Sequence, residues 1–272
     1  MTVASACRKV GMSRQSYYQH RRARSRRAID EEAVLQHVRA ERASHARMGT
    51  RKLLVNIGPE LDAMGVRIGR DRLFELLRRE DLLVRAKPSR PRTTRVDFRY
   101  PAAPNRLKDA EVAAPHQAWV GDLTYVKTRQ GWRYVSLLTD ACSRKIVGFA
   151  LWRDLTVEGP LAALEMALGQ LPEGARPLHH SDRGCQYTST PYRRRLAQAG
   201  LEPSMTEQDH CYENAMAERV NGILKQEYGL DQEFFDEAQA RRALEQAAAL
   251  YNSHRPHLSL NYRTPEAVHR AA

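Results

Sequence analysis

The sequence is poor in cysteine and has no long apolar run. It contains no C-x-x-C pair, so it predicts neither a disulfide framework nor a zinc finger. The four cysteines are scattered: Cys7, Cys142, Cys185 and Cys211. No apolar stretch reaches 18 residues, and the first 27 residues are rich in arginine and interrupted by Gly11. We therefore expect no membrane-spanning helix and no signal peptide, and the cysteine usage fits a reducing cytoplasm.

Acidic residues are scarce in the first third of the chain. Residues 1–100 carry 24 Lys and Arg against 11 Asp and Glu, a net charge of +13, whereas residues 101–272 carry 20 against 21, a net charge of −1. This asymmetry predicts that the N-terminal region binds a phosphate backbone. The alternative is a basic tail that only keeps the protein in solution. With 272 residues, 42% of them hydrophobic, the chain is long enough for one large or two smaller domains with a real core.

The N-terminal region, residues 1–87, is predicted to be all helical. Residues 4–27 have the pattern of a helix, a turn at Gly11 and a second helix capped by Ser13. In a helix-turn-helix, this second helix could enter a major groove with Arg14 and Gln15 near the base edges. An ordinary helical hairpin is the alternative. A further helix is expected over residues 28–43.

Two more helices are predicted over residues 48–65 and 67–85. The second has an apolar face formed by Leu73, Leu76 and Leu77, with arginines around it. Arg70 and Arg72 are the DNA-binding candidates among these arginines. Residues 88–114 contain four prolines between Pro88 and Pro104 and no apolar periodicity, so they are predicted to form an extended linker. The linker arginines could follow DNA, but a solvated tether is the simpler alternative.

From residue 115 to residue 272 the pattern becomes α/β. We expect a mixed sheet with helices on both faces. The predicted strands cover 118–127, 132–139, 144–151, 176–180 and 201–205. The predicted helices cover 156–170, 189–199, 213–228 and 236–250.

Three acids in this region form a candidate catalytic and metal site. Asp122 lies within a predicted strand, Asp182 follows a short strand, and Glu218 lies on a helix, with 35 residues between the last two. Carboxylate oxygens are the ligands that Mg²⁺ prefers, and two such ions can hold the attacking and leaving oxygens of a phosphodiester in line. On the helix, Glu218 shares one face with Asn214, Asn221 and Lys225. An adjacent apolar stripe consists of Ala217, Val220, Leu224 and Tyr228.

Five segments together resemble the OrfB transposases of bacterial insertion sequences, which share the retroviral-integrase catalytic core. The resemblance runs from about residue 115 to the C-terminus. The segments are WVGDLTYV, LLTDACSRKIVG, HHSDRGCQYTS, ENAMAERVNGILKQEY and YNSHRPHLSLNYRTPEAVH. The resemblance implies a ribonuclease H-like core preceded by a helix-turn-helix region, with Asp122, Asp182 and Glu218 as the catalytic acids.

The resemblance also implies the reaction and its partners. The expected enzyme is a metal-dependent DNA transposase that cuts element ends and joins the 3′-OH to target DNA, using two Mg²⁺ ions or Mn²⁺ as a substitute. Double-stranded DNA, a homo-oligomer on DNA ends, an OrfA partner or a frameshifted fusion with it, and a nucleoid-associated cytoplasmic location are implied as well. Lys225 falls on a lysine that binds DNA ends in that family, and a solvated helix lysine is the alternative.

The chain departs from the family before Glu218. Glu207 to His210 replace basic and glycine residues, and Glu213 stands where Asp is usual, so local DNA contacts are expected to differ. Asn214 is retained and could orient a ligand carboxylate or contact DNA.

Some residues near the acids have other interpretations. Asp140 is expected to organise a turn rather than bind metal. His179 and His180 are adjacent in a strand and point to opposite faces, so at most one can face the metals.

Two other functions remain compatible with the residues. A ribonuclease H-type nuclease would use the same metals without strand transfer, although it would not need a basic helical region. A catalytically silent DNA-binding regulator is the second alternative.

Overall fold

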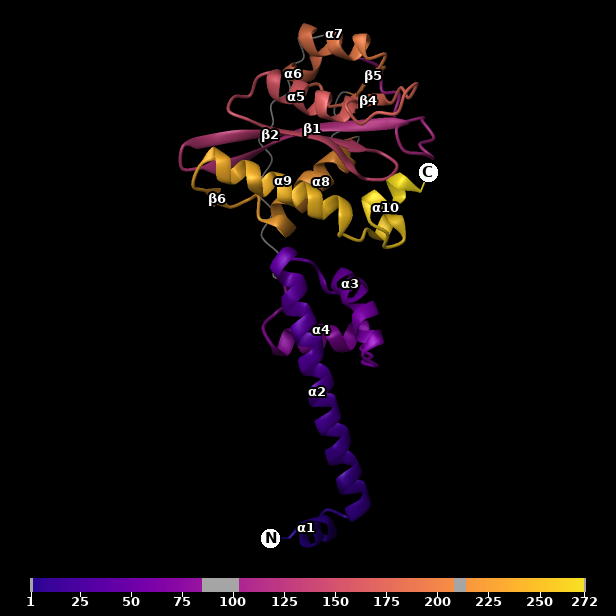
Figure 1. Cartoon of the computed structure of the whole chain (residues 1–272), viewed down its shortest axis with the longest axis vertical. Helices are drawn as coiled ribbons and strands as arrows, with labels where there is room; N and C mark the ends of the chain where they lie inside the picture. Colours follow the sequence, from indigo (N-terminus) through magenta and orange to yellow (C-terminus); the bar gives the residue numbers. More distant parts are fainter. Residues whose placement is uncertain (1, 85–102, 208–213, 272) are drawn as a thin grey trace. The chain divides into compact units, whose positions relative to one another are not determined.

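The computed structural model of the protein describes residues 2–84, 103–207 and 214–271. The chain divides near residue 85 into two units, Met1–Arg85 and Ala86–Ala272, and each has its own hydrophobic core (Figure 1). Residues 88–102 of the predicted linker and the predicted family departures between residues 208 and 213 lie outside the described residues. No helix within the described ranges is both long and apolar enough to cross a membrane.

The described part of the first unit is helical. Its elements are α1 (Val3–Lys9), α2 (Arg14–Ser44), α3 (Thr50–Ala63) and α4 (Arg70–Arg79). The predicted turn is present: Gly11 has a φ of +69°, and Ser13 Oγ accepts a hydrogen bond of 3.0 Å from Ser16 N at the start of α2. The prediction of a separate helix over residues 28–43 is wrong, because α2 is continuous. Residues 20–30 contain neither glycine nor proline, so nothing in that stretch stops the helix.

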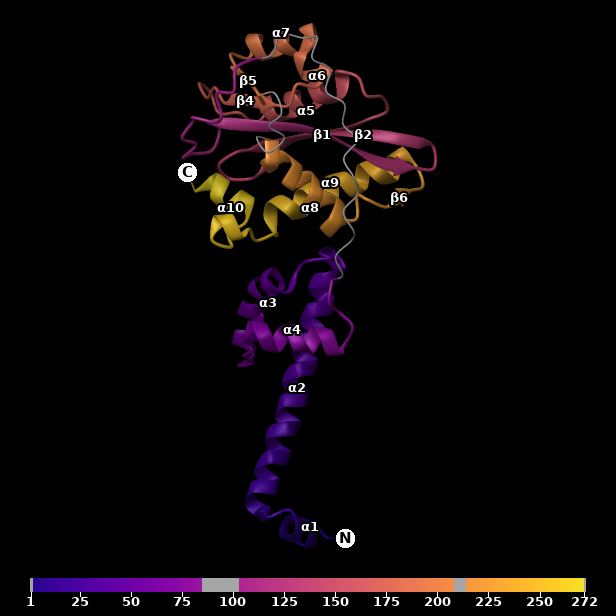
Figure 2. The same cartoon turned by 180° about the vertical axis from the view of Figure 1, so that it is seen from behind.

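Leucine and valine side chains join the last part of α2 to α3 and α4. The predicted apolar face of α4 is confirmed, since Leu73, Leu76 and Leu77 are at most 1% exposed. On α2 the buried cluster begins at Val34, and the first half of the helix continues past α3 and α4 (Figures 1 and 2). A helix half with polar residues on all sides gains little from burial. Arg21, Arg22, Arg26 and Arg27 in this half of α2 are exposed and therefore accessible to a charged partner.

The second unit is built on a mixed sheet. Its strands are β1 (Ala118–Thr128), β2 (Gly131–Asp140), β3 (Ile146–Trp152), β4 (Leu178–Ser181), β5 (Pro203–Met205) and β6 (Glu233–Phe234). The order is β3-β2-β1-β4-β5, and β6 pairs with the far end of β1. The first three strands are antiparallel, whereas β4 and β6 run parallel to β1 and β5 runs parallel to β4. The predicted mixed sheet is therefore confirmed.

Helices cover both faces of this sheet. One face carries α5 (Glu158–Leu168), α6 (Cys185–Thr188) and α7 (Thr190–Gln198). The other carries α8 (Ala215–Tyr228), α9 (Glu237–Ser253) and α10 (Pro265–Arg270), with a short 3-10 turn at Leu258–Leu260 (Figures 1 and 2). Neither β6 nor α10 was predicted. Both are short, and β6 has two residues that form a strand only because β1 is beside them.

The described end of the predicted linker lies along the second unit. Ser204 Oγ accepts hydrogen bonds from Arg106 N at 2.9 Å and from Leu107 N at 3.3 Å. Leu107 and Val112 also pack against a buried cluster that contains Val120. Residues from about 103 onward are thus structurally part of the sheet unit.

Helix α5 approaches β3 closely at Gly148. A Cβ atom at this position would overlap the carbonyl oxygen of Ala163 and lie 3.1 Å from the Cβ of Ala167. Both neighbours belong to α5, and a carbonyl oxygen in a helix cannot rotate away as a side chain can. Glycine is therefore required at residue 148 by packing.

Gly148→Ala should lower the free energy of unfolding by about 1–3 kcal/mol, because the added methyl group forces α5 away from the sheet. Urea unfolding followed by circular dichroism measures this change. Gly222→Ala on α8 is the matched control, since nothing lies within 4 Å of the added Cβ. It should raise stability by about 0.5–1 kcal/mol. Equal stability of Gly148→Ala and the wild type would contradict the close approach.

Candidate active site

The candidate site lies where the edge of β1 is left unpaired. Strand β4 pairs with β1 only at Ala118–Val120, and β6 pairs only at Lys127–Thr128. Within the described residues, no strand pairs with residues 121–126 on that edge, although β2 pairs with them on the other side. Asp122 lies at the start of this gap. The divergence of β4 from β1 therefore opens the sheet beside the first candidate acid.

Asp122 is held by two hydrogen bonds. Its Oδ2 atom accepts a 2.7 Å hydrogen bond from the side-chain nitrogen of Asn221 on α8. Its Oδ1 atom accepts a 2.9 Å hydrogen bond from Leu123 N. The carboxylate is thereby turned toward α8, the helix that carries Glu218.

Asp182 lies at the end of β4, in the turn that leads into α6. Its Oδ1 atom accepts a hydrogen bond of 3.0 Å from Gly184 N. Burial raises the pKa of Asp182, the Gly184 hydrogen bond lowers it, and the charge of Glu218 raises it again. The residue is thus close enough to Glu218 for their charges to interact.

Helix α8 places Glu218 in its first turn and turns an apolar stripe toward the sheet. Ala217, Val220 and Leu224 are buried, as the helical periodicity predicted. Asn221 is also buried, on the face that it shares with Glu218. The stripe fixes the rotation of the helix and so fixes the direction in which Glu218 points.

Two asparagines join α8 to β1. Asn214 precedes the helix, and its side-chain nitrogen donates a 3.2 Å hydrogen bond to Gly121 O. The sequence suggested Asn214 as the residue that orients a ligand carboxylate, but the amide that orients Asp122 is Asn221. Asn221 was predicted on the correct helix face without a role. The signal that could have identified it is its spacing of one turn after Glu218.

The electrostatics of the site show an accumulation of negative charge. Burial raises the pKa of Asp122 to about 7, and the charges of Asp182 and Glu218 add to this, while the hydrogen bonds from Asn221 and Leu123 oppose it. A raised carboxyl pKa means that the ionised form is under-stabilised where it lies. A bound cation would stabilise that ionised form.

The donor atoms suit a hard divalent cation. Besides the three carboxylates, two buried amide oxygens, Asn214 Oδ1 and Asn221 Oδ1, have no hydrogen-bond partner within the described residues. Carboxylate and amide oxygens are the ligands such cations take. In the described ranges, however, no three His, Cys, Asp or Glu side chains stand in metal-binding geometry.

The two histidines before Asp182 have structural roles. His179 is buried, its Nε2 atom lies 2.8 Å from the hydroxyl of Tyr192, and burial lowers its pKa to about 4. His180 Nδ1 lies 2.9 Å from Ser204 Oγ on the neighbouring strand β5. These contacts orient the two rings toward α7 and β5.

Asp140 organises the turn after β2, as predicted. Its two carboxylate oxygens accept hydrogen bonds from three backbone amides, those of His116, Cys142 and Ser143, and from Ser143 Oγ. The acid is fully buried. It is therefore a turn-forming residue.

Lys225 extends from α8 to the free edge of β1. Its Nζ atom lies 4.2 Å from the ring centroid of Tyr125. Burial lowers the pKa of Lys225, whereas the negative charges of Asp122 and Asp231 raise it. The ammonium group is thus held between an aromatic ring and the acidic site.

The DNA-binding candidates of the first unit differ in their exposure and in their ion pairs with neighbouring acids. Arg14 and Gln15 are exposed at the start of α2. Arg70 Nε lies 2.8 Å from Asp71 Oδ1, and Arg72 is ion-paired with Glu31. Arg72 therefore contributes to holding α4 against α2.

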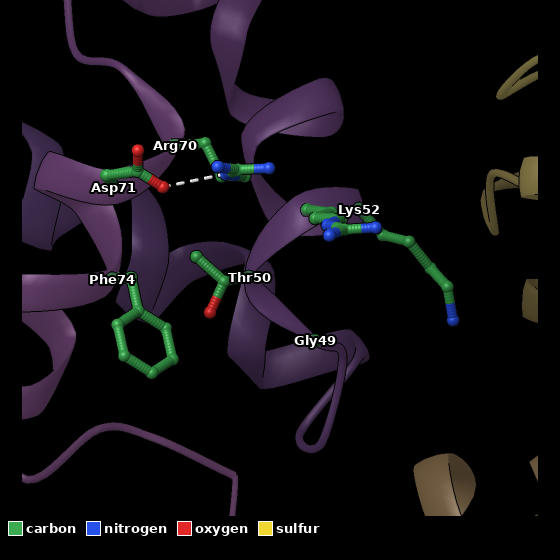
Figure 3. Close-up of a pocket in the computed structure, with 7 residues that line it drawn as sticks. Gly49, Thr50, Lys52, Arg70, Asp71 and Phe74 are labelled. Carbon is green, nitrogen blue, oxygen red and sulfur yellow. Dashed lines mark hydrogen bonds and ion pairs between the residues drawn. The ribbon is translucent and has the colours of Figure 1, made fainter.

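Arg70 belongs to a shallow basic pocket at the N-terminal ends of α3 and α4, which we call the α3–α4 pocket. Figure 3 shows Lys52 extending away from it and Phe74 on its other side. It is lined by Gly49, Thr50, Arg51, Lys52, Arg70, Asp71 and Phe74. Arg51 and Lys52 were not singled out from the sequence, because nothing in the pattern shows that the two helix starts meet.

Comparisons with known proteins identify relatives of this chain. Two family models, both described as integrase core domain, match residues 112–211 and 199–265. The chain is 37% identical over 268 residues to the 31 kDa protein of insertion element IS600 from Shigella sonnei, which covers 96% of each chain. It is 34% identical over 226 residues, 78% of each chain, to a putative transposase for insertion sequence element IS986/IS6110 from Mycobacterium tuberculosis.

A solved structure shares the fold. A chain of the simian T-cell lymphotropic virus intasome, determined in complex with the PP2A regulatory subunit B56 gamma, aligns with a TM-score of 0.50 at 15% identity. The alignment covers 84% of this chain and 72% of that chain. The ribonuclease H-like fold predicted for the sheet unit is confirmed.

The raised pKa of Asp122 predicts a pH-dependent loss of stability in metal-free protein. Its folded pKa of about 7 exceeds the value of about 3.9 for an unfolded chain. The folded state therefore holds the proton more tightly, so the contribution of this residue is full below about pH 4 and is lost as pH rises toward 7. Asp122→Asn should remove this loss, which is on the order of a few kcal/mol.

The measurement is urea unfolding of wild type and Asp122→Asn in the presence of a chelator, between about pH 4 and about pH 8. The variant should gain stability over the wild type as pH rises. Glu245→Gln, at an exposed position of α9, is the control and should follow the wild-type curve. Parallel curves for wild type and Asp122→Asn would show that Asp122 titrates normally.

Proposed function

Because the chain belongs to the transposases of bacterial insertion sequences that carry an integrase core domain, we propose that it cuts and joins DNA through Asp122, Asp182 and Glu218. The observation that supports this proposal is the charge interaction that links Asp122, Asp182 and Glu218 beside the unpaired edge of β1. Burial raises the pKa of Asp122 to about 7, and the charges of Asp182 and Glu218 add to this effect, which supports the assignment of a functional site here.

Asp122, Asp182 and Glu218 would hold the cations, with the amide oxygens of Asn214 and Asn221 close by. Both amide oxygens are buried and accept no hydrogen bond from the described residues, which supports this assignment. When bound, two divalent ions, Mg²⁺ or Mn²⁺ in its place, supply charge stabilisation to the attacking and leaving oxygens of a phosphodiester. The fixed direction of Asp122, set by Asn221, contributes the preorganisation on which such electrostatic catalysis depends.

The proposed reaction has two phosphoryl transfers at one site. In the first, the oxygen of a water molecule forms a bond to the phosphorus at the element end, and the bond from phosphorus to the 3′ oxygen breaks. The released 3′-OH then attacks a phosphodiester of target DNA in the same manner, so that one bond forms and one breaks. Each step exchanges one oxygen for another, so positioning and charge stabilisation supply most of the catalysis.

Lys225 would hold a phosphate on the strand that leaves the active site. It lies seven residues after Glu218, about 10 Å along the helix. This distance is too long for metal binding and suitable for the next phosphates. Its location beside Tyr125, at the free edge of β1, supports this role.

The first unit, together with the predicted linker, would bind the DNA backbone. The +13 net charge of residues 1–100 supports this, as do the exposed Arg14 and Gln15 at the start of α2. In the α3–α4 pocket, Arg51 and Lys52 offer further cations beside Arg70. We also propose that several copies act together on paired DNA ends. An OrfA partner or fusion rests on the resemblance alone.

Replacing any one of the three acids by its amide should abolish DNA cutting and leave DNA binding nearly unchanged. Asp122→Asn, Asp182→Asn and Glu218→Gln each remove a ligand charge at similar volume. The assay incubates purified protein with DNA that contains an element end and Mg²⁺, and resolves joined, cleaved and bound products. Glu245→Gln, at an exposed position of α9, is the matched control.

The outcomes of this assay separate the functions. Joined products support a transposase, cleavage without joining a nuclease, and binding alone a regulator. Near wild-type cutting by an amide variant would remove that residue from the site.

Neutralising two cations of the α3–α4 pocket should make DNA binding less sensitive to salt. For the double variant Arg51→Ala with Lys52→Ala, the slope of log K against log salt should become shallower by about 1.8, or about 0.9 for each phosphate that the protein no longer neutralises. The control carries Arg193→Ala and Arg194→Ala, which remove the same charge from exposed positions of α7. Equal slopes for the two double variants would place the phosphate-binding cations elsewhere.

A further inference from the structure

One face of the sheet carries exposed aromatic side chains beyond the helices that cover it. Helix α5 reaches this face as far as Ser136 and Trp152, which lie near Gly159 at the start of that helix. Beyond this point, Tyr125 on β1 is 52% exposed and Trp132 on β2 is 49% exposed. Two half-exposed large rings side by side form an apolar surface that a solvated sheet does not need.

The two rings form a defined pair. Tyr125 is opposite Tyr134, and Trp132 is opposite Lys127, so Tyr125 and Trp132 are diagonal neighbours on the same face. Their ring centroids are 5.1 Å apart, and the ring planes are nearly perpendicular at 88°. This edge-to-face contact holds both rings in place. We call Tyr125 and Trp132 the aromatic shelf.

The aromatic shelf lies beside the catalytic acids. Tyr125 is three residues after Asp122 on the same strand, about 10 Å along it, so the two side chains point to opposite faces of the sheet, on either side of the unpaired edge of β1. Lys225 places its ammonium group 4.2 Å from the Tyr125 ring centroid. An apolar surface, a cation and an acidic site thus follow one another along the unpaired edge of β1.

This combination matches one nucleotide of a DNA strand. A base presents a π face that stacks on aromatic rings whatever its identity, and its phosphate is attracted to a nearby ammonium group. A second copy of the chain could also cover two aromatic rings. A lysine poised between the shelf and the acids favours a polyanion, because a protein surface would have to bury that charge.

Resting on the proposed transposase function, we propose that Tyr125 and Trp132 stack an unpaired base of the DNA strand beside the cutting position, while Lys225 binds the adjoining phosphate. Bases inside a duplex are already stacked on one another. The aromatic shelf therefore selects DNA whose end is frayed or single-stranded, and it fixes where the strand lies relative to Asp122.

The experiment uses the full chain and an element-end duplex with a short single-stranded tail. The reporter is a single 2-aminopurine, moved through the positions around the cut, whose fluorescence is quenched by stacking. Wild type should quench it at one position within about two nucleotides of the cut, given the separation of about 10 Å between Tyr125 and Asp122. Trp132→Leu should remove the quenching and weaken binding about tenfold, whereas Trp132→Phe should retain most of both.

An abasic site at the quenched position separates stacking from other effects. It should weaken wild-type binding by the same factor and have no further effect on Trp132→Leu, because both changes remove the same stacking interaction. Lys225→Ala should weaken binding to intact and abasic DNA alike. Leu258→Ala is the control, since Leu258 is also a large apolar side chain, 63% exposed, but lies in the 3-10 turn that follows α9.

Several results would overturn the proposal. One is wild-type protein that cuts DNA but quenches no position, which leaves the proposed function intact. Another is a Trp132→Leu variant whose affinity, relative to the wild type, falls by the same factor for intact and for abasic DNA. A change in oligomer mass on Trp132→Leu without any dependence on the base would assign the shelf to a second copy. Wild type that neither binds nor cuts element ends would remove both the shelf and the proposed function.

Discussion

The candidate site depends on two amide hydrogen bonds that hold α8 against β1. Asn214 donates to the backbone of Gly121, and Asn221 donates to the carboxylate of Asp122. Since Glu218 lies between Asn214, which caps α8, and Asn221 within it, these bonds set its distance from Asp122. Both asparagine side chains are buried, so the loss of these bonds would leave their amide groups without a partner or water. One pair of amides thus fixes both the helix and the acid that the helix faces.

Helix α8 is supported in turn by the C-terminal part of the chain. Arg255 is 2% exposed, and its guanidinium makes two 2.8 Å hydrogen bonds with Glu227 near the end of α8. Asn252 on α9 bonds both the N–H and the C=O of Ile146 on β3. Breaking a buried ion pair by removing one partner typically costs about 3–5 kcal/mol. Arg255 and Asn252 therefore help to maintain the position of Glu218 through contacts made away from it, at Glu227 and Ile146.

The sequence predicted the elements that have strong local signals. The strand of Asp122 and the apolar stripe of α8 follow from periods of 2 and 3.6, and the turn at Asp140 follows from its place after a strand. It did not predict that α2 is continuous, because a missing stop signal is harder to recognise than a cap. It also missed the role of Asn221 and the neighbourhood of Tyr125 and Trp132. Those depend on helix packing and strand register, which local pattern does not determine.

The acids are costly to the fold, and the same helix that carries one of them offsets the cost. Ionised carboxylates gathered at a partly buried edge are poorly solvated and repel one another, which is the reason for the raised pKa of Asp122. On the other side of α8, Val220 and Leu224 are buried against the sheet. Each such side chain contributes about 1.5–3 kcal/mol, comparable to the electrostatic penalty. The apolar face can therefore keep α8 docked against the sheet while the opposite, polar face carries Glu218 close enough to Asp122 and Asp182 for their charges to interact.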